Sequence, residues 1–223
     1  MSVWQIPSPD GIDGENGTTR ACPSICLNPT VLTPNQAFQT SFPDQAFMQN
    51  PPLIKDDLLA LLGELGIAHE TIIHPPLHTV EEAQAWRAGK SGGFCKNLFL
   101  KDKKGALWLI VTLETRNIRL NSLPKALGSA RLSFANADLM GEHLGVKPGS
   151  VTPFAVINDR AHKVQIILDA PMLDHDPLHY HPLTNEATTT ISREDLLKFL
   201  RHSGHEPIII DLEAAAGDPA AAT

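Results

Sequence analysis

The chain has 223 residues, of which 42% are hydrophobic and 19% are charged, and its formal net charge at pH 7 is −7. This composition excludes a wholly disordered polymer, and no apolar run approaches the ~20 residues that a membrane-spanning helix needs. The N-terminus lacks the basic start and apolar core of a signal peptide, so we expect a cytoplasmic location and no membrane partner.

The first 50 residues differ from the rest of the chain. They are rich in Pro, Gly, Asn, Ser and Thr and repeat turn signals such as Pro9-Asp10-Gly11. We therefore expect a disordered or loosely packed extension over 1–50, a folded domain over 51–213 and a flexible tail over 214–223. An alternative is that translation starts at Met48. No second cysteine pair accompanies Cys22 and Cys26, so we expect neither a zinc site nor another cofactor there.

Before the centre of the chain, the pattern alternates between helix and strand. Leucines at helical spacing predict a helix over 53–65 that ends at Gly66, and a short strand follows over 69–74. Thr79 to Glu82 is typical of a capping box and predicts a helix to about residue 88. His74 and His78 flank two prolines and are interpreted as surface or pocket-rim residues.

The central feature is a predicted hairpin. Residues 94–100 and 106–113 are rich in bulky residues, and 102–105 carry turn chemistry. Because side chains alternate along a strand, Lys96 shares a face with Phe94, Leu98 and Leu100, which we expect to be buried. The lysine then either extends to the rim of the sheet or points into a cavity. Cys95 faces the other way, and we expect it to be packed and inert.

The remaining elements mix helices and strands without a βαβ repeat, which predicts an α/β or α+β domain with a mixed sheet. No dinucleotide-binding or P-loop motif is present. In chain order we expect a helix over 121–127, a strand over 131–134, a helix over 136–144, a loop over 145–152, strands over 153–157, 163–168, 178–182 and 187–191, a helix capped by Ser192, and a mostly buried strand over 208–212.

Charge is unevenly distributed. Between Arg87 and Arg131 the chain carries ten basic residues against Asp102 and Glu114 alone. A basic patch on an acidic protein suits a local contact with phosphates better than the wrapping of a long duplex, although an ordinary solvated face gives the same count. DNA is therefore not an expected partner.

The run Lys96-Asn97-Leu98-Phe99-Leu100-Lys101-Asp102-Lys103-Lys104 resembles the signature of the YbaK-type editing domains associated with prolyl-tRNA synthetase. Three later stretches follow in the order of that family, namely Gly145 to Pro153, His181 to Asn185, and Ala187 to Thr190. The chain is most similar to the free-standing ProXp-ala deacylases. This resemblance implies a mixed, partly closed sheet flanked by helices.

The resemblance also implies a site. Lys96 would hold the aminoacyl end of the tRNA, the backbone at Gly149 would stabilise the ester carbonyl, and His181 would contact the amino acid. We assign these three residues to catalysis. Substrate binding is assigned to Asn97, Ser150, Pro153 and Asn185, and tRNA binding to Lys101, Lys103, Lys104 and Arg116.

The function implied is a trans-editing deacylase that hydrolyses mischarged tRNA(Pro), most of all Ala-tRNA(Pro), with prolyl-tRNA synthetase as a further partner. Relatives often have a small or polar residue where this chain has Phe94, so cysteine or serine could replace alanine as the amino acid removed. Two different functions also stay open. One is a binding module without turnover, and the other is a metallohydrolase built on Asp174, His175, Asp176, His179 and His181.

Overall fold

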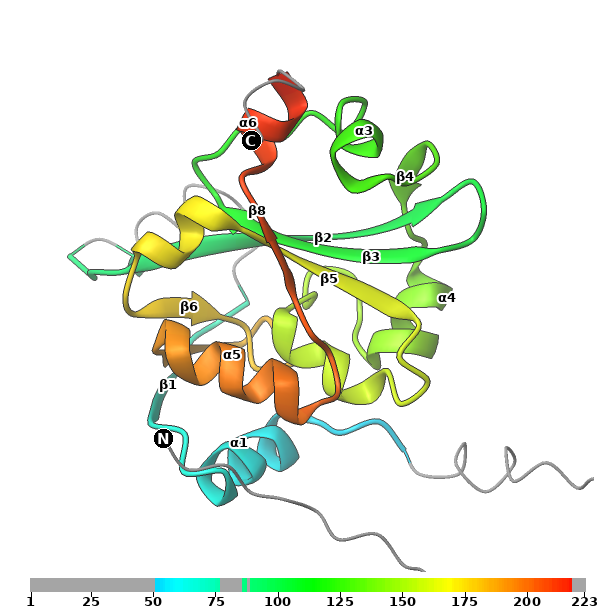
Figure 1. Ribbon diagram of the computed structural model, residues 1–223. Coiled ribbons are helices and arrows are strands. Elements are labelled where there is room, and N and C mark those ends of the chain that lie inside the picture. The colour runs from blue at the N-terminus through cyan, green and yellow to red at the C-terminus, as the bar shows by residue number, and fades with distance from the viewer. Residues whose placement is uncertain (1–50, 77–85, 88, 218–223) are drawn as a thin grey trace, which may run out of the picture. The chain divides into compact units, whose positions relative to one another are not determined.

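The computed structural model describes residues 51–76, 86–87 and 89–217 (Figure 1). All of them belong to one of the two units into which the chain divides, Pro43–Thr223. The predicted N-terminal extension, Cys22 and Cys26, most of the helix expected over 79–88, and His78 lie outside the described residues.

An eight-stranded mixed sheet forms the centre of the domain, in the order β1-β7-β6-β2-β3-β5-β8 with β4 paired to β2. The pairs β2–β6, β3–β5 and β5–β8 are parallel, and the others are antiparallel. The strands are β1 (His69–Ile73), β2 (Gly93–Asp102), β3 (Leu107–Leu113), β4 (Leu132–Phe134), β5 (Val164–Asp169), β6 (Leu178–Tyr180), β7 (Ala187–Ile191) and β8 (Ile208–Ile210). This architecture confirms the predicted mixed α/β fold.

Helices cover both faces of the sheet, with α1 and α5 on one side and α3 and α6 on the other (Figure 1). A larger core joins α1 and α5 to the sheet through Leu58, Phe99 and Phe199, and a smaller core joins Leu100 and Leu212. The helices are α1 (Lys55–Glu64), α3 (Leu123–Leu127), α4 (Ala137–Leu139), the π-helix η2 (Met140–Leu144), α5 (Arg193–His202) and α6 (Leu212–Gly217), with 3-10 helices η3 (Pro153–Asn158) and η4 (Ala170–Asp174).

The central hairpin is confirmed as β2 and β3, in antiparallel register with Lys96 opposite Thr112. The carboxylate of Asp102 accepts hydrogen bonds from the N–H groups of Lys104 and Ala106, at 2.8 and 3.0 Å, which closes the turn. Cys95 packs against the larger core and Leu98 against the smaller one. Both faces of β2 are therefore covered by other parts of the domain. The sequence predicted this burial only for the face that carries Lys96.

Two predicted strands differ in the structure. Residues 153–158 form η3, because Pro153 suits the first turn of a helix and the Thr152 hydroxyl accepts from the N–H of Phe154 at 3.4 Å. The last strand is not mostly buried, since Ile208 and Ile209 are 49% and 48% exposed at the edge of the sheet. Helix α6 then continues past the expected boundary at 213. Within the described residues, every helix is too short or too polar to cross a bilayer.

Candidate functional site

Lys96 lies half-buried on β2, with its ammonium group turned to the end of β3. Nζ donates to the backbone carbonyl of Glu114 at 3.2 Å and also to that of Arg116. An ammonium group has three N–H donors, so one donor remains for a ligand. Within the described residues, Lys96 forms no hydrogen bond with His181 or with the loop that contains Gly149.

Asn97, the next residue, points to the opposite face and binds the glycine–proline loop, Gly149 to Pro153. Its Nδ2 donates to the carbonyl of Val151 at 2.9 Å. Ser150 is 7% exposed, and its N–H already donates to the carbonyl of Lys147 at 3.0 Å. The N–H groups of Gly149 and Val151 have no partner among the described residues, which leaves two donors for a ligand.

Gly149 adopts φ +89°, a left-handed conformation that favours glycine. A side-chain carbon at this position would lie 3.8 Å from Nδ2 of Asn185, so the glycine–proline loop adjoins the loop after β6. The structure therefore brings Asn97, Gly149 and Asn185 close to one another. Pro153 is buried as the first residue of η3.

His181 follows β6 and is half-buried. Its Nδ1 donates to the carbonyl of Ala187 at 3.1 Å, because a carbonyl can only accept. Burial lowers the pKa of His181 below its ordinary value, and this outweighs the opposite effect of the Ala187 carbonyl. The neutral ring then carries its lone pair on Nε2, which has no partner among the described residues. His181 is thus fixed as a hydrogen-bond acceptor.

Two further histidines lie in the same region, although the sequence suggested His179 only as a candidate metal ligand and His74 only as a surface or pocket-rim residue. His179 is 7% exposed, stacks on Phe94 with ring centroids 4.3 Å apart, and donates from Nε2 to the carbonyl of Ser91 at 2.7 Å. His74 is 6% exposed and binds the hydroxyl of Thr188 at 2.9 Å, so it is not a rim residue. The sequence offered one signal for these contacts, the threonine-rich run from Ala187 to Thr190. Thr188 binds His74, and Thr190, two residues on and on the same face of β7, binds His179.

Phe94 is confined between its neighbours. The guanidinium of Arg87 lies 5.1 Å from the ring centroid, and His179 stacks on the ring. Gly92, at φ +109°, allows this approach, because a side-chain carbon there would lie 2.8 Å from Nε2 of His179. The aromatic side chain is therefore packed between Arg87 and His179.

Cys95 has the environment of a structural thiol. It lies 3.6 Å from the hydroxyl of Tyr180, and burial raises the pKa of the thiol to about 12. A thiolate is needed for nucleophilic attack, so Cys95 is not a nucleophile near neutral pH.

The acidic and histidine residues near β6 are dispersed. Asp174, His175 and Asp176 are exposed, and both ring nitrogens of His179 are bonded, to Ser91 and Thr190. Among the described residues, no three His, Cys, Asp or Glu side chains are grouped as metal ligands.

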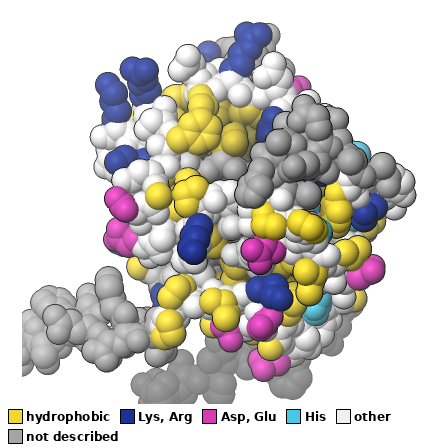
Figure 2. All heavy atoms as spheres, turned by 180° about the vertical axis from the view of Figure 1, so that it is seen from behind, with side chains coloured by type: hydrophobic (Ala, Val, Ile, Leu, Met, Phe, Trp, Pro, Cys, Tyr) yellow, Lys and Arg dark blue, Asp and Glu magenta, His cyan; other side chains and the backbone are white. Residues whose placement is uncertain are grey.

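The basic residues fall into two environments. Lys101, Lys103 and Lys104 are exposed at the hairpin end of β2 and its turn. Seen from behind, Lys and Arg side chains gather at the upper edge of the molecule (Figure 2). Arg116, by contrast, is 17% exposed and forms ion pairs with Asp169, Asp211 and Glu213. Its charge is already neutralised within the protein.

Comparison with known proteins identifies the family. The model of the aminoacyl-tRNA editing domain matches residues 74–199. The chain belongs to this family. It is 41% identical over 165 residues to prolyl-tRNA synthetase associated domain-containing protein 1 of Xenopus laevis, covering 72% of this chain and 98% of that protein.

A bacterial relative and a solved structure agree with this assignment. The prolyl-tRNA editing protein ProX of Acetoanaerobium sticklandii is 35% identical over 159 residues, covering 71% of this chain and 97% of that protein. A solved structure described as a candidate trans-editing enzyme for prolyl-tRNA synthetase covers 70% of this chain and 94% of that chain, with TM-score 0.53 and 18% identity. At that identity the second match supports the fold alone.

Proposed function

We propose that this chain is a trans-editing deacylase that hydrolyses the ester of mischarged tRNA(Pro), with Ala-tRNA(Pro) as its main substrate. The observation that carries the proposal is the glycine–proline loop, where the N–H groups of Gly149 and Val151 are unused by the described residues. Two such donors suit the oxygen of an ester carbonyl, which gains negative charge as water attacks.

An aminoacyl ester is already activated, so the chemistry needs no protein nucleophile. The high pKa of Cys95 agrees with this scheme. The attack of water breaks the acyl–oxygen bond, releasing the free amino acid and the ribose hydroxyl of the tRNA. A neighbouring ribose hydroxyl of the substrate assists the water, as the family resemblance implies.

Three side chains would position the substrate. The remaining N–H of Lys96 would donate to an oxygen of the terminal nucleotide or of the ester. Nε2 of His181 would accept from the substrate's ammonium group. Asn185, beside Gly149, would keep the loop that carries His181 next to the glycine–proline loop.

Editing by size explains why such an enzyme is needed. A synthetase pocket rejects a smaller apolar side chain by only ~1–3 kcal/mol, so a second site must hydrolyse the products that escape. Phe94, packed between Arg87 and His179, would narrow this site and favour alanine over larger residues.

The tRNA would approach along the hairpin. Lys101 lies five positions from Lys96 on β2, roughly 17 Å at ~3.3 Å per residue. Exposed Lys101, Lys103 and Lys104 would then meet phosphates of the acceptor stem while its end reaches Lys96. Arg116 is left out of this surface because its partners are carboxylates. Binding of prolyl-tRNA synthetase is proposed only by analogy with the names of the relatives.

The test is deacylation of alanyl-, cysteinyl-, seryl- and prolyl-tRNA(Pro) by wild type and Lys96→Ala. Lys198→Ala is the matched control, because Lys198 is exposed and also donates to a backbone carbonyl, that of Leu65 at 2.6 Å. We expect wild type to hydrolyse alanyl-tRNA(Pro) and to leave prolyl-tRNA(Pro) intact. Lys96→Ala should lose this activity, and Lys198→Ala should keep it. Hydrolysis of cysteinyl- or seryl-tRNA(Pro) in place of alanyl-tRNA(Pro) would overturn the proposed preference for alanine. Binding of tRNA without hydrolysis of any ester would favour a non-catalytic module.

A further inference from the structure

We propose that Arg116, Asp169, Asp211 and Glu213, called here the arginine cluster, are positioning residues that hold the ammonium group of Lys96. The inference rests on the proposed role of Lys96 in deacylation. It gives Arg116 and the C-terminal helix a role in the site, in place of the tRNA contact expected from the sequence.

The link begins at the carbonyls that Lys96 binds. They belong to Glu114 and Arg116, in the turn that follows β3. A lysine side chain has a flexible four-carbon stem, so its direction depends on what its ammonium group binds. Displacement of this turn would therefore move the N–H that remains for the substrate.

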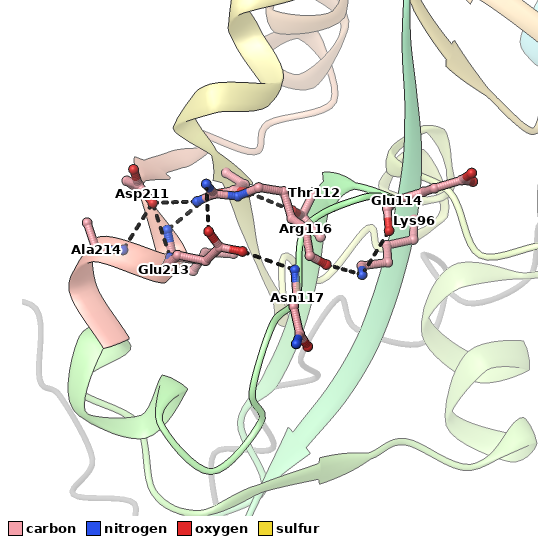
Figure 3. A network of polar contacts seen from close by, with 10 residues as sticks. Lys96, Thr112, Glu114, Arg116, Asn117, Asp211, Glu213 and Ala214 are labelled. Atoms are coloured by element: carbon pink, nitrogen blue, oxygen red, sulfur yellow. Dashed lines mark hydrogen bonds and ion pairs between the residues drawn. The ribbon is translucent and has the colours of Figure 1, made fainter. Parts of the chain in front are cut away.

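The turn is fixed by the side chain of Arg116 (Figure 3). The guanidinium donates to Asp169 at 3.0 and 3.3 Å and to Asp211, and Nη1 lies 3.0 Å from Glu213. Glu213 also accepts from the backbone N–H of Asn117 at 3.0 Å. One residue thus presents its carbonyl to Lys96 and its side chain to three carboxylates.

Asp169 connects the arginine cluster to the sheet beneath Lys96. It is fully buried at the end of β5, and it accepts from the hydroxyl of Thr112 at 2.6 Å and the N–H of Leu212 at 3.0 Å. Thr112 lies opposite Lys96 in the hairpin. The strand residue opposite Lys96 and the turn that binds its ammonium group are therefore anchored to the same carboxylate.

A second contact holds the other carbonyl. The side chain of Glu114 forms an ion pair with Arg87, and its N–H donates to the carbonyl of Phe94 at 3.0 Å. Burial by itself lowers the pKa of Arg116, but the bonds to Asp169 and Asp211 outweigh it, so the pKa lies above its ordinary value. The guanidinium stays charged, and the arginine cluster holds the turn at any pH at which the carboxylates are ionised.

The experiment uses Glu213→Ala, which removes one of the three carboxylates that bind Arg116 and the acceptor of the Asn117 N–H. Glu213 is exposed, so the substitution leaves the buried core intact. Arg116→Lys is the second variant, since it keeps the charge and loses the forked geometry. Glu206→Ala is the matched control, because Glu206 pairs with Arg201 at an exposed site outside the arginine cluster. Thermal unfolding defines a temperature at which all variants are folded.

We expect kcat for Ala-tRNA(Pro) to fall roughly 10- to 100-fold in Glu213→Ala and Arg116→Lys, the size of loss that a small misplacement of a catalytic group gives, with KM nearly unchanged. In a Lys96→Ala background the same substitutions should add no further loss. An equal loss in that background, or no loss in wild type, would overturn the positioning role.

A readout without turnover separates this inference from the proposed function. Acetylation of Lys96 by an amine-reactive ester, followed by peptide mass spectrometry, reports how freely its amine moves. We expect the rate to rise in Glu213→Ala and Arg116→Lys and to stay at the wild-type value in Glu206→Ala. An unchanged rate in the two cluster variants refutes positioning. Absence of deacylation by wild type would refute the proposed function alone.

Discussion

The bond between Asn97 and Val151 is the contact by which β2 holds the glycine–proline loop, and Asn97→Ala removes it. The carbonyl of Val151 would lose its partner, which costs ~1–3 kcal/mol for a buried acceptor. Oδ1 of Asn97 is itself buried without a partner among the described residues, so the substitution also removes that penalty. We therefore expect a loss near the lower end, about 1 kcal/mol.

That loss corresponds to a fall in Tm of about 2–4 °C for a domain of this size. Expressed as a free energy, the loss of kcat for deacylation should exceed the loss of stability, because the N–H donors of Gly149 and Val151 would no longer be held in place. Urea and thermal unfolding, together with kcat for Ala-tRNA(Pro), measure the two effects. Asn121→Ala is the control, since Asn121 is exposed and its side chain has no hydrogen bond within the described residues. Equal stability and equal kcat in the two variants would refute this reasoning.

Three further predictions concern titration. Burial lowers the pKa of His181 below its ordinary value of about 6.5, so kcat should be level near pH 7 and should fall with a midpoint below about 6.5, as Nε2 gains a proton; a midpoint at or above about 6.5 would contradict this. The Cys95 thiol, with a pKa of about 12, should escape iodoacetamide in the folded protein at pH 8 by peptide mass spectrometry, and Cys95→Ala should keep its kcat. Burial raises the pKa of Asp159, but the bonds from His205 and from the backbone N–H groups of Val164 and Lys163 outweigh it, so the net pKa is lowered. The contribution of Asp159 to stability is therefore present above about pH 4, and it is lost as the pH falls through the lowered pKa of Asp159 in the folded protein. In urea unfolding, the stability of Asp159→Asn should depend less on acid pH than that of wild type.

The hairpin could be predicted because its determinants are local. Asp102 closes its own turn, and the bulky residues on each side need only their neighbours to form a ladder. The burial of the last strand was harder to predict from the sequence. Three consecutive isoleucines, Ile208 to Ile210, predicted burial, yet an edge strand leaves apolar side chains exposed, and the sequence does not state which strand lies at the edge.

The partners of charged side chains were the least predictable part of the site. A count of basic residues placed Arg116 with Lys101, because no acidic residue other than Glu114 lies near it in sequence. Asp211 and Glu213, which neutralise it, follow about a hundred residues later and reach it only through β8 and α6. His74 was likewise assigned to a rim, since nothing local indicated that Thr188 of β7 would bind it.

Lys96 and Asn97 are adjacent on β2 but bind partners on opposite faces of the sheet. Their contacts therefore depend on the pairing register between β2 and β3. Side chains alternate, so Lys96 reaches the turn held by the arginine cluster, while Asn97 reaches the glycine–proline loop over the larger core. A shift of one residue would exchange the two faces, placing an ammonium group against the Val151 carbonyl and an amide against the turn. Asp102 opposes such a shift, because its carboxylate fixes the hairpin turn and also accepts from the N–H of Ala130 at 3.2 Å. The acidic residue in the middle of a basic run is thus a register determinant for residues far along the same strand.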